Sequence, residues 1–255
     1  MKLLTWNCRG LGNPRTVNEL HQLVKERTPS VIFLSETKGN RCKVEKVRNK
    51  LGMKQSFVVD SIGKSGGLAM LWKTEVNAQL LSYSNSHISL TIFPESSGQP
   101  WRLFGFYGNP ATDKRKASWS LLKMLKPKPP MAWLCMGDFN EILSNDEKYG
   151  VVTRSFSQME CFRLAIDECD LSDLGYTGSK YTWSNNREGR DFTKERLDRA
   201  MGNREWPLQF SNSEVSVLPA LNSDHSPLLI TCDNEEAGVN RRTRLFRYEA
   251  YWSTK

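Results

Sequence analysis

The sequence lacks any long apolar run: no stretch approaches the ~18 consecutive apolar residues that a membrane-spanning helix needs. The strand-like segment Lys2–Trp6 directly follows Met1, which leaves no room for the basic and apolar regions of a signal peptide. These two absences predict a soluble protein that stays inside the cell.

Paired metal-binding cysteines are also missing. The six cysteines are scattered, with no C-x-x-C pair and no histidine near them at zinc-ligand spacing. We expect reduced, mostly buried thiols and no zinc site. Of the three histidines, His21 and His87 are predicted to be partly exposed structural residues, which leaves His225 as the candidate for chemistry.

What the sequence does contain is enough apolar material for one core. Hydrophobic residues make up 38% of the 255 positions and include 8 Trp and 11 Phe, so bulk disorder is not expected. The formal net charge is +8, which fits a polyanionic partner such as nucleic acid without requiring one.

Apolar periodicity predicts a strand, helix, strand, helix opening followed by many strands. Val17, Leu20 and Val24 recur at helical spacing after Pro14, and Val31–Leu34 has the length of a strand. A helix is predicted over Lys114–Leu125, and Ser157–Glu160 matches a capping box that would start another. Further strands are predicted at 57–59, 66–72, 76–83, 88–93, 103–107, 132–136, 181–183, 196–199, 214–217 and 227–231.

This pattern predicts an α+β fold, a four-layer α/β/β/α sandwich of two packed mixed sheets with helices outside. The two β-rich runs are of similar size, each with helices between strands. We expect one domain over residues 1–232. Residues 233–255 are expected to form a polar linker and the start of a further segment.

Acidic and amide side chains gather where predicted strands end. Taken singly, each has an ordinary explanation, because Asp and Asn after a strand commonly form turns. Together they supply what phosphodiester hydrolysis needs: carboxylates for a hard cation, a base for water and a donor to the phosphoryl oxygens. The residues are Asn7, Glu36, Asp138, Asn140, Asp224 and His225.

Six motifs occur in order along the chain: Trp6–Leu11, Ser35–Thr37, Gly105–Gly108, Gly137–Asn140, Arg196–Arg199 and Ser223–His225. This ordered set resembles the endonuclease/exonuclease/phosphatase superfamily, whose fold is that of pancreatic-type deoxyribonuclease.

A second set of segments comprises Trp6–Gly12, Phe106–Pro110, Thr182–Asn185, Glu195–Ala200 and Phe246–Trp252. These segments resemble the endonuclease domain of plant LINE-type retrotransposons, where a reverse transcriptase follows in the same chain. One departure is Val151, where such elements often have a second glycine after Gly150.

The resemblance implies a role for each matching residue. Glu36 would be the principal Mg²⁺ ligand, with Asn7 and Asp224 near the same ion, and Mn²⁺ could replace Mg²⁺. Asp138 would activate the attacking water, and Asn140 would fix that water. Tyr107 would hydrogen-bond the scissile phosphate, and His225 would donate to a phosphoryl oxygen. Asp198 would hold the His225 ring and favour its charged form.

The implied substrate is DNA, which a monomer in the nucleus would nick. Trp183 is either core or a platform for a base, and the basic run after position 114 is either a solvated helix face or a phosphate track. The residues that we predict to contact nucleic acid are Lys114, Arg115, Lys116, Trp183 and Arg196.

Two alternatives stay open. The first is a phosphatase or phospholipid phosphodiesterase of the same fold, because fold and catalytic motifs do not fix the substrate. The second is a non-catalytic, nucleic-acid-binding remnant of a retrotransposon. A complete set of candidate catalytic residues argues against the remnant.

Overall fold

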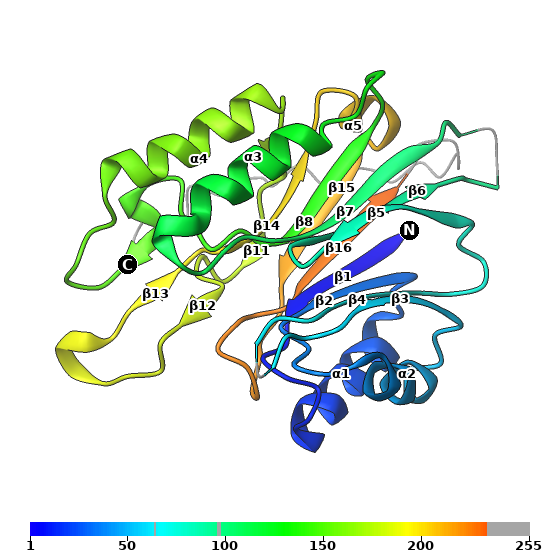
Figure 1. The fold of residues 1–255 in the computed structure, drawn as a ribbon, viewed down its shortest axis with the longest axis horizontal. Coiled ribbons are helices and arrows are strands. Elements are labelled where there is room, and N and C mark those ends of the chain that lie inside the picture. The colour runs from blue at the N-terminus through cyan, green and yellow to red at the C-terminus, as the bar shows by residue number, and fades with distance from the viewer. Residues whose placement is uncertain (64, 96–97, 234–255) are drawn as a thin grey trace, which may run out of the picture.

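The computed structural model describes residues 1–63, 65–95 and 98–233. Two large sheets pack face to face, and two helices cover the outer face of each (Figure 1). The predicted sandwich of two mixed sheets flanked by helices is confirmed. Nearly all of the expected linker lies outside the described residues. In the described part of the chain, no helix combines the length and the apolar character needed to cross a membrane.

The first sheet has seven strands in the order β11-β15-β16-β1-β2-β4-β3. Its pairs are antiparallel except β1 with β2 and β11 with β15. The strands are β1 (Lys2–Asn7), β2 (Val31–Ser35), β3 (Gln55–Val59), β4 (Leu68–Trp72), β11 (Thr177–Gly178), β15 (Asn212–Val217) and β16 (Leu228–Asp233).

The second sheet has six strands in the order β10-β14-β8-β7-β6-β5, with only β7 and β8 parallel among its pairs. A small third sheet, β12-β13-β9, lies beside the sandwich (Figure 1). The strands are β5 (Ala78–Ser84), β6 (His87–Ile92), β7 (Trp101–Tyr107), β8 (Trp133–Asp138), β9 (Lys148–Tyr149), β10 (Ser172–Asp173), β12 (Trp183–Ser184), β13 (Lys194–Glu195) and β14 (Asp198–Gly202).

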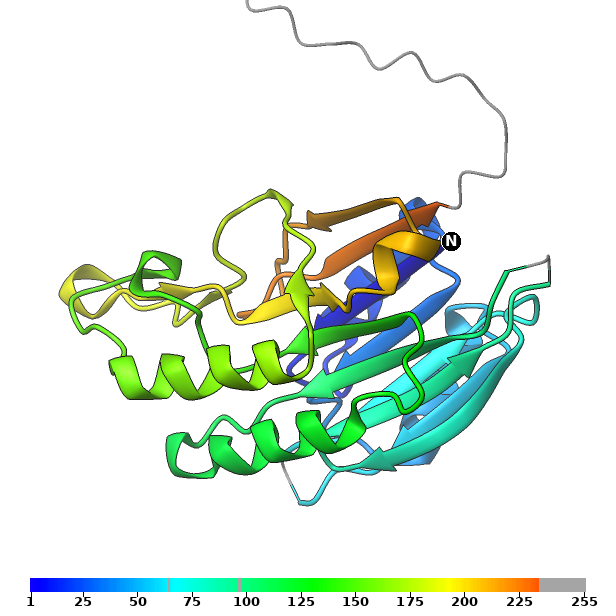
Figure 2. The same ribbon diagram turned by 90° about the horizontal axis from the view of Figure 1, so that it is seen from above.

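The helices form the two outer layers, which Figure 2 shows from above. Helices α1 and α2 cover the first sheet, and α3 and α4 cover the second. The bounds are α1 (Pro14–Arg27), α2 (Arg41–Lys50), α3 (Arg115–Leu125), α4 (Phe156–Glu168) and α5 (Trp206–Gln209), with 3-10 turns η1 (Thr112–Lys114), η2 (Asn145–Glu147) and η3 (Gly189–Asp191).

The central strands are apolar on both faces because each face is covered. On β2, Phe33 points into the core between the sheets, while Ile32 and Leu34 pack under the helices. A strand buried on both sides reads as a continuous apolar run instead of an alternating one. Gly105 on β7 makes room for Phe33, since a Cβ there would lie 2.1 Å from the Phe33 ring.

Two local predictions are wrong. Helix α4 begins at Phe156 after Ser155, which makes no side-chain cap, so the predicted capping box at Ser157 does not form. The apolar face of α4 is nevertheless buried as predicted. His87 is 3% exposed, because it starts the inner strand β6 and its ring is hydrogen-bonded by Ser82 and Ser84.

Candidate active site

Four strand ends meet at one edge of the sandwich. Asn7 at the end of β1 is the register partner of Ser35 at the end of β2, which precedes Glu36. Tyr107 and Asp138 are register partners at the ends of β7 and β8. Since both pairs are parallel, their carboxyl ends lie at the same edge of each sheet. The amide of Asn7 donates to Asp138 Oδ2 at 2.9 Å and joins the two edges.

A buried chain of polar contacts runs across this edge. Asp198 Oδ2 lies 2.9 Å from His225 Nδ1, and His225 Nε2 lies 3.4 Å from the Asn7 amide nitrogen. On the far side, Asn140 donates its backbone N–H to Asp138 Oδ1 at 2.8 Å and its side-chain amide to Asp138 Oδ2 at 3.1 Å. All five side chains are at most 9% exposed, so each contact acts in a medium of low polarity.

Backbone conformation helps to fix the Asp138 loop. Asn140 has a left-handed φ of 56°, a conformation that Asn tolerates better than most residues. Its amide also donates to the Gly108 carbonyl at 2.8 Å. Gly137 is at φ 144°, and a Cβ there would lie 2.0 Å from the Phe106 carbonyl oxygen, so only glycine fits.

Burial and charge shift the pKa values of this chain. Burial by itself would lower the pKa of His225, but the carboxylates of Asp198 and Asp138 outweigh it and raise the pKa to about 9. Burial raises the pKa of Asp138, and the positive charge of His225 only partly opposes that rise. A charged imidazole therefore faces two carboxylates, with Asp138 Oδ2 3.8 Å from Nε2.

Glu36 is the centre of a second cluster. The Tyr107 hydroxyl donates to Glu36 Oε1 at 2.6 Å, while Arg9 Nη1 and Lys38 Nζ each lie 3.2 Å from Oε2. Burial would raise the pKa of Glu36, but the Tyr107 hydrogen bond and the two cations lower it below its ordinary value. Burial and the neighbouring Glu36 raise the pKa of Tyr107, which therefore stays a neutral hydrogen-bond donor.

Asp224 lies between Arg9 and Trp183. Arg9 Nε is 3.1 Å from Asp224 Oδ1, and the Trp183 indole N–H donates to Oδ2 at 3.1 Å. Asp224 Oδ1 is buried and accepts no hydrogen bond from the described residues.

These donors suit a hard divalent cation. Glu36 and Asp224 offer carboxylate oxygens, and Asn7 offers an amide oxygen whose contact with the Arg9 N–H is long, at 3.4 Å. Asp138, Asp198 and His225 also bring ligand atoms within 4.8 Å of one another. Both nitrogens of His225 already face carboxylates, however, so that group forms a hydrogen-bonded unit and leaves no ring nitrogen free for a metal.

The comparison with protein families identifies the family of this chain. A model of the endonuclease/exonuclease/phosphatase family matches residues 4–225, most of the chain. The chain belongs to the endonuclease/exonuclease/phosphatase family. No match is found among curated protein sequences.

Solved structures of nucleases share the family fold. A 3'-5' exonuclease from Neisseria meningitidis aligns with a TM-score of 0.69 at 17% identity over 91% of this chain and 100% of its own. An AP endonuclease from Archaeoglobus fulgidus gives 0.70 at 17% over 91% and 99%. The endonuclease domain of TRAS1, a telomere-specific non-LTR retrotransposon, gives 0.64 at 13% over 92% and 99%.

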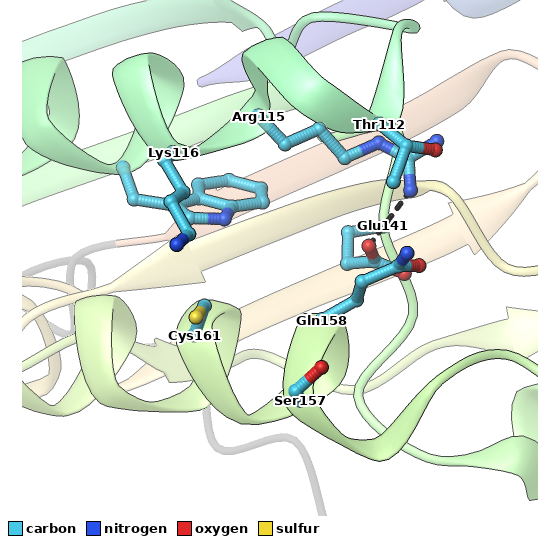
Figure 3. A pocket seen from close by; sticks show the side chains of 8 residues that line it. Thr112, Arg115, Lys116, Glu141, Ser157, Gln158 and Cys161 are labelled. Carbon is cyan, nitrogen blue, oxygen red and sulfur yellow. Dashed lines mark hydrogen bonds and ion pairs between the residues drawn. The ribbon is translucent and has the colours of Figure 1, made fainter.

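Two of the residues predicted to contact nucleic acid are buried in ion pairs. Arg115 is 8% exposed and its Nη1 lies 2.8 Å from Glu141, as the dashed line in Figure 3 marks. Arg196 is 3% exposed, and its Nη2 donates to both oxygens of Asp173. Either guanidinium would have to break these pairs to reach a phosphate, and their contact with nucleic acid stays a prediction. Lys114 and Lys116 are exposed.

Trp183 packs against the small core cluster of Ile142, Met159 and Leu197, and its role as a platform for a base stays a prediction. It is half-buried, and its ring centroid lies 6.5 Å from that of His225. The indole N–H is engaged by Asp224, so its structural role is to hold that carboxylate.

Sequence reasoning missed Thr182 and the contacts of Arg9 and Lys38. The buried Thr182 hydroxyl accepts the N–H groups of Leu197 and Asp198 at 3.0 and 2.9 Å. The Thr182 carbonyl accepts the N–H of Ser226 at 2.7 Å, so this residue holds both Asp198 and the loop of His225. The only feature of the sequence that pointed to Thr182 was its position beside Trp183. The hydrogen-bond partners of a hydroxyl group cannot be predicted from its neighbours in the sequence.

The raised pKa of His225 leads to a direct prediction. In metal-free protein the ring should stay charged until the pH approaches about 9, and Asp198→Asn should lower that pKa, because Asp198 makes the largest raising contribution. The folded-state pKa lies above the ordinary value of 6.5, so the contact stabilises the fold below pH 6.5 and this contribution is lost as the pH rises through 9.

The measurement is an NMR titration of the histidine ring protons, with the His225 signal assigned by its loss in His225→Gln. A His225 pKa that is the same in wild type and Asp198→Asn would contradict the assigned role of Asp198.

Proposed function

We propose that this chain is a divalent-metal-dependent endonuclease that nicks DNA. The observation that carries the proposal is the buried contact chain Asp198, His225, Asn7, Asp138 and Asn140, beside the Glu36 and Tyr107 pair. This arrangement supports the proposal because it would supply a base, a charged donor and cation ligands at one edge, the groups that phosphodiester hydrolysis requires.

Asp138 is the proposed general base. Its raised pKa brings the carboxylate closer to the working pH, which favours accepting a proton from water. Asn140 and Asn7 hold its two oxygens in a fixed direction. Because the Asn140 amide N–H groups are engaged by Asp138 and Gly108, we assign Asn140 to orienting the carboxylate and, through it, the attacking water.

His225 and Tyr107 are the proposed donors to the phosphate. The charged imidazole has a second N–H at Nε2, on the side away from Asp198. Tyr107 is a neutral phenol whose single O–H donates to Glu36 in this structure, so it would have to turn from that carboxylate to donate to the phosphate. A bound Mg²⁺ or Mn²⁺ held by Glu36, Asp224 and Asn7 would neutralise charge that develops on the phosphoryl oxygens. The residues themselves bind and orient the phosphate and move the proton.

Two observations favour DNA over a small phosphorylated substrate: the positive charge of the chain and its similarity to solved nuclease structures. The net charge of +8 and the exposed Lys114 and Lys116 suit a polyanion that extends beyond one phosphate. The similar structures include an AP endonuclease and the endonuclease domain of a retrotransposon. A chain acting as the endonuclease part of a retrotransposon, ahead of a reverse transcriptase, is consistent with this.

The test is nicking of supercoiled plasmid by the purified chain with Mg²⁺, run beside release of phosphate from inositol phosphates. We expect open-circular product that requires Mg²⁺ and disappears with excess chelator, and no release of phosphate. Undiminished nicking in chelator would contradict the metal requirement. Phosphate release without nicking would favour the small-substrate phosphatase.

A further inference from the structure

Arg9 contacts each of the three residues proposed to hold the metal. Its Nη1 lies 3.2 Å from Glu36 Oε2, its Nε lies 3.1 Å from Asp224 Oδ1, and its backbone N–H donates to Asn7 Oδ1 at 3.4 Å. A guanidinium therefore bridges the two carboxylates that a cation would bridge. Arg9 itself has a left-handed φ of 52°, two residues after the end of β1.

Charge is balanced at this site without a metal. Glu36 and Asp224 carry two negative charges, and Arg9 and Lys38 carry two positive ones in direct contact with them. A guanidinium cannot lose its proton in a protein, so Arg9 cannot become neutral when another cation arrives. A divalent ion placed beside it would meet like charge in a partly buried site, where repulsion is weakly screened.

The side chain of Arg9 has room to move away from the two carboxylates. It is 45% exposed, whereas the side chains of Glu36 and Asp224 are 10% and 19% exposed. The carboxylates are thus fixed in the structure, while the guanidinium lies at the open side. The contact between Arg9 and Asp224 is an ion pair and not a hydrogen bond, since Asp224 Oδ1 has no hydrogen-bond partner among the described residues.

We propose that Arg9 is an internal counter-ion that holds the cation position of the metal-free site and competes with the divalent metal for Glu36 and Asp224. This inference rests on the metal site of the proposed function. Metal binding is then an exchange in which the guanidinium swings out toward solvent. The positive charge of Arg9 stabilises the two largely buried carboxylates when no metal is bound. The same charge lowers the affinity of the site for metal.

The experiment measures binding of Mn²⁺ to the metal-free full chain without DNA, from the loss of the free-ion signal in electron paramagnetic resonance. Arg9→Gln keeps a polar side chain but removes the competing charge. We expect it to bind Mn²⁺ about tenfold more tightly than wild type, the scale of losing two partly exposed ion pairs to the ligands. Arg9→Lys keeps the charge and should stay near wild type.

Matched variants separate local competition from net charge. Arg15→Gln removes the same charge from an exposed position at the start of α1 and should leave the Mn²⁺ affinity unchanged. Glu36→Gln should abolish binding and so place the ion. Circular dichroism melting of each variant confirms that the comparison is made between folded proteins.

The outcomes distinguish the inference from the function on which it rests. Tighter binding by Arg9→Gln but not by Arg15→Gln supports competition. Equal or weaker binding by Arg9→Gln, with measurable binding by wild type, overturns the inference and leaves the metal site standing. No Mn²⁺ binding by either protein at millimolar ion would overturn the metal site itself.

Discussion

Asp138→Asn is expected to lower kcat for plasmid nicking by at least about 100-fold, the scale of losing a well-placed acid/base or electrostatic group. Asparagine has the shape of aspartate and can still accept the Asn140 backbone N–H, but it cannot take a proton from water. The substitution should therefore lower kcat, while the affinity for DNA, measured in Ca²⁺, stays close to that of wild type.

The control is Asp146→Asn, which removes the same charge from an exposed position in η2. It should nick plasmid at the wild-type rate. A kcat for Asp138→Asn within about fivefold of wild type would be too small a loss for a general base. It would assign Asp138 to structure alone.

His225→Ala is expected to remove nicking to a similar extent without weakening the salt-dependent part of DNA binding. In the proposed mechanism His225 contacts only the scissile phosphate, so the slope of log affinity against log salt should change by no more than about one phosphate's worth. Replacing exposed Lys114 and Lys116 by glutamine should instead flatten the slope, if they contact DNA, and leave chelator sensitivity unchanged.

Asp198 should act through His225. The two side chains are 2% and 3% exposed and meet at 2.9 Å, so the carboxylate fixes both the direction and the charge of the ring. Without the imidazole ring, Asp198 should have little effect on binding or hydrolysis of the phosphate. The double variant Asp198→Ala/His225→Ala should therefore lose about as much as His225→Ala alone. A loss equal to the product of the two single losses would show that the residues act independently.

The sequence by itself determined most of the local structure and singled out most of the residues that meet at the candidate site. The strand Val31–Ser35 could be predicted because a strand that is buried on both faces has a nearly continuous run of apolar residues. Polar residues at strand ends, among them Asn7 and Asp138, could be singled out because such ends gather functional groups. The resemblance then supplied the roles, and the family membership that it implied is confirmed.

Only the tertiary structure decided which distant groups face each other. The amide of Asn7 reaches Asp138 across 131 positions of sequence, and the strands of the first sheet come from both ends of the chain. Arg115 looked like a surface cation and is buried against Glu141. The partner of a charged residue cannot be read from the sequence, because the packing of strands and helices determines which ion pairs and hydrogen bonds form. The position of Arg9 between Glu36 and Asp224 was settled in the same way, by packing that brings three separate strand ends and loops to one edge.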